Sequence, residues 1–195
     1  NMYYTAEQLI EMASRGEGFS RIPEGYWLVP IRRNQADQKA NEFNDVVHLM
    51  HGRKLITSTT CTTTPGLPAL QGGFKKYNSQ GAAVVCANVW MYNAFSYGLH
   101  SGKMRCLREV KPILTTRDGN MNSVAEEYGK RHLGMWYTNF HAASYKYLDT
   151  IVRKWIGHWS YGCIVCNNRV EYDKIIDLTM SQKGVSMIIL NEFSV

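Results

Sequence analysis

Short apolar runs closed off by glycines and tight turns constrain the fold of this chain more than any other feature of its sequence. Residues 46–50 and 54–59 flank His51-Gly52-Arg53, which predicts a β-hairpin with a short glycine-containing loop. Further short strands are expected at 26–31, 82–87, 93–97, 111–118, 136–141 and 185–193. Many short strands with few helices predict a mainly β fold, either a β-sandwich or a partly closed barrel. Pro30 suggests that the first strand lies at an edge or carries a bulge.

Two helices are expected, one towards each end of the chain. Thr5 and Gln8 have the spacing of a capping box, so a short helix should begin there and run to about Ser14. Apolar residues recur at helical spacing over 170–182, and Gly184 should end that helix. No repeat, low-complexity tract or long linker interrupts the 195 residues, and one hydrophobic core can serve roughly 250. We therefore expect a single domain over 1–195.

The stretch 134–166 concentrates the side chains that can do chemistry at neutral pH. Its first part predicts a strand of aromatic and β-branched residues that ends at His141. Its last part, Ser-Tyr-Gly-Cys at 160–163 followed by an apolar run, predicts a tight turn that presents the Cys163 thiol beside backbone N–H groups. A thiol needs a neighbouring imidazole to be mostly thiolate near pH 7. The stretch therefore predicts a cysteine nucleophile with His141 as its general base.

Each of these side chains also has a purely structural interpretation. Cys163 could be a buried thiol, since free cysteines are among the most buried residues. His141 could be a strand-end histidine satisfied by hydrogen bonds. The tight turn favours the nucleophile at position 163. For His100, in Gly-Leu-His-Ser-Gly at 98–102, a substrate contact and an ordinary loop position both stay open.

Five short segments of the chain follow one another in a recognisable order. They are Thr-Thr-Pro-Gly at 63–66, Gly-Leu-His-Ser-Gly-Lys at 98–103, Arg-Asp at 117–118, Asn-Phe-His at 139–141 and His-Trp-Ser-Tyr-Gly-Cys at 158–163. This order resembles the L,D-transpeptidase catalytic domain, and more closely the phage-encoded branch of that superfamily. The five segments in sequence order carry more weight than any one of them alone.

The resemblance implies an L,D-transpeptidase-like fold whose Cys163 attacks the stem peptides of peptidoglycan. His141 would take the thiol proton, and the backbone N–H groups of Tyr161, Gly162 and Cys163 would hold the oxyanion. The expected substrate contacts are four residues around this pair: His100, Trp159, Ser160 and Tyr161. The implied activity is that of a cysteine peptidoglycan peptidase of carboxypeptidase, endopeptidase or transpeptidase type.

The phage-like character of the resemblance and two departures from the cellular enzymes bear on the choice between hydrolysis, transpeptidation and loss of activity. A phage-like protein gains from cutting walls, so hydrolysis is favoured, as in an endolysin, while transfer to a second stem stays open. The cellular enzymes usually have His where this chain has Tyr161, and Arg or Asn where it has Val165. These two departures support an alternative function, a non-catalytic virion or cell-wall-binding module that keeps the fold.

Cys163 and Cys166 form a Cys-x-x-Cys motif that has two further interpretations. A redox pair would need a strand-to-helix corner of a βαβ fold, whereas the expected strands look antiparallel and hairpin-linked. A zinc site would need two more ligands, and no second Cys-x-x-Cys or His-x3-His spacing is present. Strand alternation turns the two side chains to opposite faces, so Cys166 is expected in the core. The odd total of five cysteines predicts reduced thiols, and we expect neither a metal nor a cofactor.

Charge and hydropathy limit the partners and the location. The 22 Lys and Arg residues outnumber the 16 Asp and Glu, which gives a net charge of +6 that attracts polyanions. The basic residues are dispersed, without an Arg-rich helix or zinc-finger spacing, so nucleic acid is not expected and an anionic bacterial cell wall explains the charge equally well.

No apolar run of about 18 residues predicts a membrane span. No signal peptide is recognised, so we expect synthesis in the cytoplasm and action on the wall after release or as part of a virion. The sequence does not fix an oligomeric state.

Overall fold

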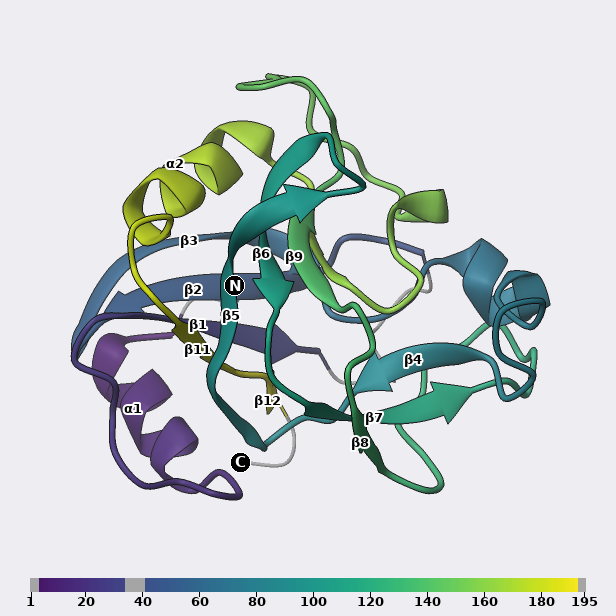
Figure 1. Ribbon diagram of the computed structural model, residues 1–195, viewed down its shortest axis with the longest axis horizontal. Helices are drawn as coiled ribbons and strands as arrows, with labels where there is room; N and C mark the ends of the chain where they lie inside the picture. The colour runs from purple at the N-terminus through teal and green to yellow at the C-terminus, as the bar shows by residue number, and fades with distance from the viewer. Residues whose placement is uncertain (1–3, 34–40, 193–195) are drawn as a thin grey trace.

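A β-barrel forms the body of the protein (Figure 1). The computed structural model describes residues 4–33 and 41–192. The barrel sheet contains β1 (Tyr26–Arg32), β2 (Asp45–His51), β3 (Lys54–Thr62), β5 (Trp90–His100), β6 (Met104–Glu109), β9 (Asn139–Ala142), β10 (Ile164–Cys166), β11 (Val185–Ile188) and β12 (Leu190–Asn191). A smaller sheet contains β4 (Ala82–Val85), β7 (Ile113–Asp118) and β8 (His132–Gly134). The helical elements are α1 (Ala6–Ser14), α2 (Arg169–Thr179) and the short turns η1 (Ala69–Gly73) and η2 (Gly157–Trp159).

The barrel closes because β1 pairs on both of its sides. Leu28 lies opposite Leu49 of the antiparallel strand β2 and opposite Met187 of the parallel strand β11. The order β11-β5-β6-β9-β10-β3-β2-β1 therefore returns to its start, and eight strands of the described residues form a ring without a free edge. The prediction of a mainly β fold is confirmed, and the barrel is fully closed.

Pro30 lies inside this ring and not at an edge of the sheet. The parallel pairing of β1 stops at Leu28 with β11 and resumes at Ile31 with β12. The missing N–H of Pro30 falls in the gap between the two ladders, so the sheet tolerates a proline there.

The two helices cover different sides of the barrel sheet. In α1, Thr5 Oγ1 accepts the Gln8 N–H and Gln8 Oε1 accepts the Thr5 N–H, which confirms the predicted capping box. The apolar face of α1 packs on Trp27 and other residues of β1 that point out of the barrel. None of the helices in the described ranges is long and apolar enough to cross a membrane.

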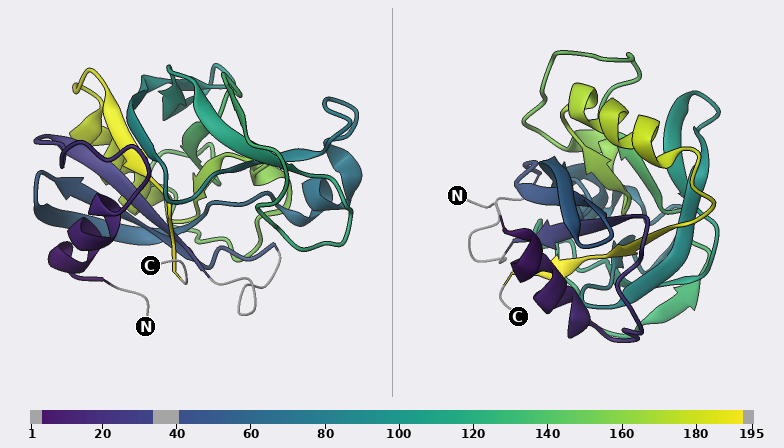
Figure 2. Two further views of the ribbon diagram at one scale, coloured as in Figure 1. Left: turned by 90° about the horizontal axis from the view of Figure 1, so that it is seen from below. Right: turned by 90° about the vertical axis from the view of Figure 1, so that its left-hand side faces the viewer.

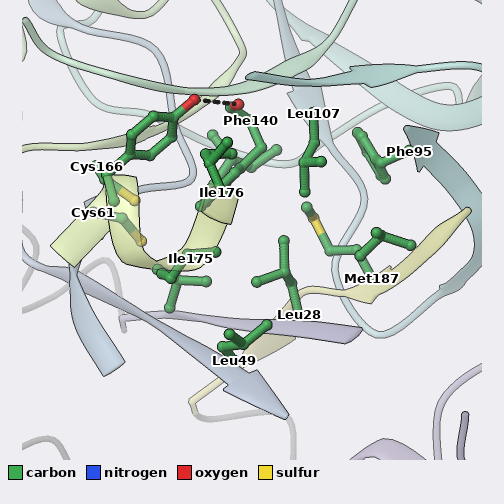
Figure 3. Close-up of a cluster of buried hydrophobic side chains, with 14 of the residues drawn as sticks. Leu28, Leu49, Cys61, Phe95, Leu107, Phe140, Cys166, Ile175, Ile176 and Met187 are labelled. Carbon is green, nitrogen blue, oxygen red and sulfur yellow. Dashed lines mark hydrogen bonds between the residues drawn. The ribbon is translucent and has the colours of Figure 1, made fainter. Parts of the chain in front are cut away.

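The second helix, α2, fills the barrel interior from one end. Ile175 and Ile176 pack among Leu28, Phe95 and Phe140 (Figure 3). These side chains come from widely separated parts of the sequence, so α2 fixes the barrel strands relative to one another. The helix ends at Thr179, earlier than the sequence predicts.

The smaller sheet lies at the end of the molecule remote from α1 (Figure 2). The chain passes between the two sheets four times, at β3–β4, β4–β5, β6–β7 and β8–β9. Two segments of the barrel side contact the smaller sheet near the predicted site: the first is the link between β8 and β9, and the second is the turn before β10. Trp136 Nε1 in the first segment donates to the Ile113 carbonyl of β7 at 3.1 Å. Gly162 in the second abuts the Ala83 carbonyl of β4. The space between the two sheets is therefore bordered by the segments that the sequence singles out.

Several strands differ from their predicted bounds: the strand predicted at 93–97 extends over Trp90–His100 as β5, and those predicted at 82–87 and 111–118 are shorter. The predicted strand 136–141 begins only at Asn139, because the N–H groups of Trp136 and Thr138 both donate to Glu109 Oε1, at 3.0 and 3.1 Å. Tyr137 between them has a φ of 58°. One carboxylate thus takes the place of a strand ladder, and the chain arches there.

Strand β6 was not expected from the sequence, because Arg105 and Arg108 interrupt its apolar pattern. Arg105 instead pairs with carboxylates of α2, which lets a charged residue face that helix. The predicted last strand 185–193 is divided into β11 and β12, and its final residue, Phe193, lies outside the described residues.

Asp173 of α2 provides a test of whether buried ion pairs hold this helix in the barrel. Its fully buried carboxylate accepts from Arg105 Nη2 at 3.1 Å, from Arg169 Nε at 3.0 Å and from the Leu148 N–H at 2.8 Å. Asp173→Ala should lower the free energy of unfolding by about 3–5 kcal/mol, because it strands two cations in or near the core. Urea denaturation measures this change.

Asp177→Ala is the matched control, since Asp177 pairs with the same Arg105 at 2.7 Å but its side chain is 54% exposed. Its cost should stay below about 1 kcal/mol. Equal losses for the two variants would show that the buried network does not hold α2.

Candidate active site

The parallel pairing of β9 with β10 brings the predicted nucleophile and base together. Ile164 lies opposite Phe140, and Val165 lies opposite His141. Ile164 and Phe140 point into the barrel core, so His141 and Cys163, one residue away along each strand, point to the other face. The expectation that the strands here are antiparallel and hairpin-linked is wrong, since β9 and β10 are parallel.

The Cys163 thiol is half-buried and protonated at neutral pH. Its sulfur accepts the backbone N–H of Asn139 at 3.4 Å. Burial raises the pKa of Cys163 to about 11, against that hydrogen bond, and the nearby Glu109 carboxylate acts in the same direction as burial. Desolvation therefore outweighs the one interaction that would favour a thiolate.

The His141 imidazole is also neutral. Its ring is 1% exposed, and Nδ1–H donates to the Ala142 carbonyl at 3.0 Å, which leaves the lone pair on Nε2. Burial, together with the charge of His100, lowers the pKa of His141 to about 3. The ring is thus held in the tautomer that can accept a proton, and it carries no charge at pH 7.

His100 lies against the base. The His100 and His141 rings stack with centroids 3.9 Å apart and planes 17° apart. Asn139 Nδ2 donates to His100 Nδ1 at 2.9 Å, so His100 carries its proton on Nε2 when neutral. Burial and the charge of Arg108 lower the pKa of His100. His100 is the last residue of β5 and contacts the base, so it is not an ordinary loop residue, and a substrate contact by His100 stays a prediction.

No hydrogen bond joins His141 to Cys163 within the described residues. The two lie on adjacent strands but two positions apart in register, which corresponds to roughly 8 Å between Cα atoms. Catalytic hydrogen bonds are often long before substrate binds. The resting state is a neutral thiol on the same sheet face as a neutral imidazole, rather than the expected thiolate.

Ser160 and Gly162 shape the turn that presents the thiol. Ser160 Oγ accepts the Gly162 N–H at 3.1 Å and donates to the Cys163 carbonyl at 2.9 Å. Gly162 has a φ of 135°, and a Cβ there would lie 2.6 Å from the Ala83 carbonyl oxygen. The turn therefore requires the serine and the glycine of the Ser-x-Gly-Cys pattern, whereas residue 163 takes part only through its backbone carbonyl. Ser160 is fully buried, so its position differs from the predicted substrate contact.

The same turn lowers the number of N–H donors that remain for the predicted oxyanion hole. The Gly162 N–H already donates to Ser160 Oγ, whereas the described residues provide no backbone acceptor for the N–H groups of Tyr161 and Cys163. Those two N–H groups remain as candidate oxyanion donors. The turn itself is supported by Gly66, whose N–H donates to the Ser160 carbonyl at 3.0 Å. The Thr-Thr-Pro-Gly segment thus has a structural part in the site.

A pocket of about 380 Å³ leads to Cys163 from the junction of the two sheets. Its walls are mostly aromatic, with one cation: Phe74, Tyr77, Ala83, Arg117, Trp136, Tyr137, Thr138, Tyr161, Gly162 and Cys163. A larger cavity of about 680 Å³, lined by Tyr92 and Gln182 among others, contains none of the candidate catalytic residues. The smaller pocket can therefore bring a ligand to the thiol.

The two predicted aromatic contacts occupy different positions. Tyr161 forms part of the pocket wall, where its ring lies 5.8 Å from that of Phe74 and its hydroxyl is 2.6 Å from His158 Nδ1. Trp159 is half-buried against Tyr145 and the side chains behind the thiol, and it does not line the pocket. Tyr161 is therefore the better placed of the two to contact a ligand.

The sequence missed several residues that build this site. Asn139 contacts both the thiol and His100, Glu109 holds the arch at 136–138, and Arg117 and Phe74 line the pocket. Arg117 and Asn139 do fall within the segments of the recognised order, and that membership was the available signal. Glu109 and Phe74 carry no sequence signal of this kind.

The other cysteines are not arranged for chemistry. All five are free, and Cys166 is fully buried in the barrel core on the face opposite to Cys163. Within the described ranges, no group of three or more His, Cys, Asp or Glu side chains is arranged to hold a metal ion. The zinc interpretation of the Cys-x-x-Cys motif therefore gains no support from the geometry.

Comparison with known proteins identifies no relative. No family model matches the chain, and no curated protein or solved structure is significantly similar to it.

The buried histidine makes stability depend on pH. In the unfolded chain His141 returns to its ordinary pKa of 6.5, so between about pH 3 and 6.5 only the unfolded state binds this proton. Stability should fall as the pH drops through that window, with about 3 kcal/mol of the loss by pH 4 due to His141. His141→Gln should flatten the slope of unfolding free energy between pH 7 and pH 4.

His51→Gln provides the control, because His51 is exposed at the β2–β3 turn. This variant should keep the wild-type slope. If His141→Gln keeps that slope too, the imidazole is not buried in its neutral form.

Proposed function

We propose that this protein is a cysteine-dependent acyl-transfer enzyme that hydrolyses the stem peptides of peptidoglycan. One observation carries the chemistry: a half-buried thiol at the end of a pocket shares a sheet face with an imidazole fixed in the proton-accepting tautomer. A nucleophile, a base and two backbone N–H groups are the parts that acyl transfer requires. The choice of peptidoglycan rests on the ordered resemblance to L,D-transpeptidases, and the net charge of +6 is compatible with an anionic wall.

In the first half-reaction His141 Nε2 removes the Cys163 proton as the sulfur attacks the peptide carbonyl carbon. The C–S bond forms, and the carbonyl π electrons move to oxygen, where the N–H groups of Tyr161 and Cys163 donate to the oxyanion. Collapse of this tetrahedral intermediate breaks the C–N bond. The imidazolium returns its proton to the leaving amine, which leaves a thioester on Cys163.

In the second half-reaction the acceptor decides between hydrolysis and transpeptidation. His141 removes a proton from the acceptor, which attacks the thioester carbonyl, and the thiol is released with that proton. The described rim of the pocket includes Tyr77 and Tyr137, both exposed, so water reaches the thioester from the open side. We favour hydrolysis on this ground.

The neutral pair shapes the catalytic mechanism. Burial raises the pKa of Cys163 and lowers that of His141, so both groups rest neutral, and in the proposed mechanism proton transfer accompanies the attack. His141 acts as a base only while the attacking sulfur develops its new bond.

The same neutral, unbonded pair favours the alternative function, a wall-binding or virion module without activity. A protonated thiol reacts slowly with alkylating reagents at pH 7, since the thiolate is the nucleophile. Slow alkylation of Cys163 would therefore suit both functions. Product release from peptidoglycan is the measurement that separates them.

The first test removes the nucleophile. Cys163→Ala should abolish the release of peptides from purified peptidoglycan, as followed by mass spectrometry, because no other described thiol faces the pocket. The melting temperature should change little, since the sulfur makes one weak hydrogen bond.

Cys86→Ala is the thiol control, because Cys86 lies at the end of β4 and does not line the pocket. It should release peptides at the wild-type rate. Full activity in Cys163→Ala would refute the nucleophile, and an inactive wild type would leave the binding module as the function.

The second test concerns the Tyr161 ring at the pocket wall. Tyr161→Ala should raise KM while kcat changes by less than about tenfold, because the ring contacts the ligand equally in the ground and transition states. Tyr161→Phe keeps the ring beside Phe74 and loses only the hydroxyl near His158, so it should resemble the wild type. A collapse of kcat in either variant would instead give Tyr161 a part in proton transfer.

A further inference from the structure

Among the described residues that line the pocket leading to Cys163, Arg117 is the one cation, and it has no function in the mechanism above. Its guanidinium lies 5.0 Å from the Trp136 ring centroid and 6.0 Å from that of Phe74. Nη1 donates to the Gly81 carbonyl at 3.3 Å. The aromatic rings and this bond hold the planar group in one place, at the boundary of the pocket.

Among the described residues, no carboxylate neutralises this guanidinium. Within residues 4–33 and 41–192 no ion pair involves Arg117, and burial lowers the pKa of its guanidinium without a compensating acidic neighbour. The adjacent Asp118 accepts the Glu126 N–H through Oδ2. A partly buried cation without a counterion is unfavourable, and binding an anion would relieve that cost.

Strand pairing places Arg117 next to the residue that contacts the turn before Cys163. Arg117 lies opposite Ala83 in the β4–β7 pairing, and the Ala83 carbonyl abuts Gly162, the residue before Cys163. Arg117, Ala83, Gly162 and Cys163 also line the same pocket of about 380 Å³. A pocket of this size holds a ligand of about two residues. An anion on Arg117 would thus lie within one residue of the carbonyl that Cys163 attacks.

We infer that Arg117 forms an anionic subsite that binds a substrate carboxylate one residue from the scissile bond. A guanidinium donates to a carboxylate through two parallel N–H bonds, and one cation matches one monoanion. A phosphate dianion would need more donors than a wall of aromatic side chains supplies. This inference rests on the proposed function for the identity of the scissile bond.

Two carboxylates of a stem peptide meet this description. One is the terminal α-carboxylate of the residue that leaves, and its recognition would make the protein a carboxypeptidase. The other is a carboxylate on the branch of the residue that is acylated. Both are monoanionic carboxylates that Arg117 could bind. Converting one of them at a time to an amide shows which carboxylate the subsite recognises.

The experiment measures binding by calorimetry to Cys163→Ala protein, which cannot turn over. The probes are a tetrapeptide stem with all carboxylates free, the same stem with its C-terminus amidated, and the same stem with its branch carboxylate amidated. One amidation should weaken binding by about tenfold to a hundredfold, the contribution of a charge-assisted hydrogen bond pair. Arg117→Gln, added to Cys163→Ala, should remove that discrimination.

Arg53→Gln in the same background is the charge-matched control, since Arg53 is exposed at the β2–β3 turn. It should keep the preference for the free carboxylate. The inference fails if the three stems bind Cys163→Ala equally, if none of them binds, or if Arg117→Gln retains the preference.

The same measurements keep this inference separate from the proposed enzyme. Arg117-dependent preference for the free acid in a protein whose wild type releases no peptide would support the subsite and reject the catalysis. Peptide release by the wild type, together with an unchanged preference in Arg117→Gln, would support the catalysis and reject the subsite.

Discussion

The parallel pairing of β9 with β10 is the constraint on which the site depends. Parallel strands cannot be joined by a tight turn, so the chain must leave β9 after Ala142 and return before Ile164 through a long crossover. That crossover packs Ala143 and Ile156 beside Val165 on the face that carries His141. The burial of the imidazole, and with it the lowered pKa, follows from the topology of the barrel.

The crossover is in turn fastened to the barrel by buried charge. Arg169 donates to the Ser144 carbonyl at 2.7 Å, and Asp173 accepts the Leu148 N–H. Both residues belong to α2, which also fills the barrel core. The helix that completes the hydrophobic interior therefore also holds the crossover between β9 and β10.

Local patterns in the sequence were sufficient to predict the hairpin, the capping box and the Ser-x-Gly-Cys turn, because each is fixed by residues close in the chain. The partners of the thiol were harder to predict. Asn139 reaches the sulfur only through the parallel register, and Arg117 reaches the pocket only because Ala83 lies between β7 and the turn. Such contacts depend on which strands become neighbours, and hydrophobic periodicity does not encode that choice.

Glu109 shows how the construction of the pocket acts on its chemistry. By accepting the N–H groups of Trp136 and Thr138, its carboxylate arches the chain and sets the aromatic wall of the pocket. The same negative charge raises the pKa of the Cys163 thiol, and burial does so more strongly. A site built in this way opposes a resting thiolate. Its chemistry is better served by a base that takes the proton during attack, and the neutral tautomer of His141 is suited to that task.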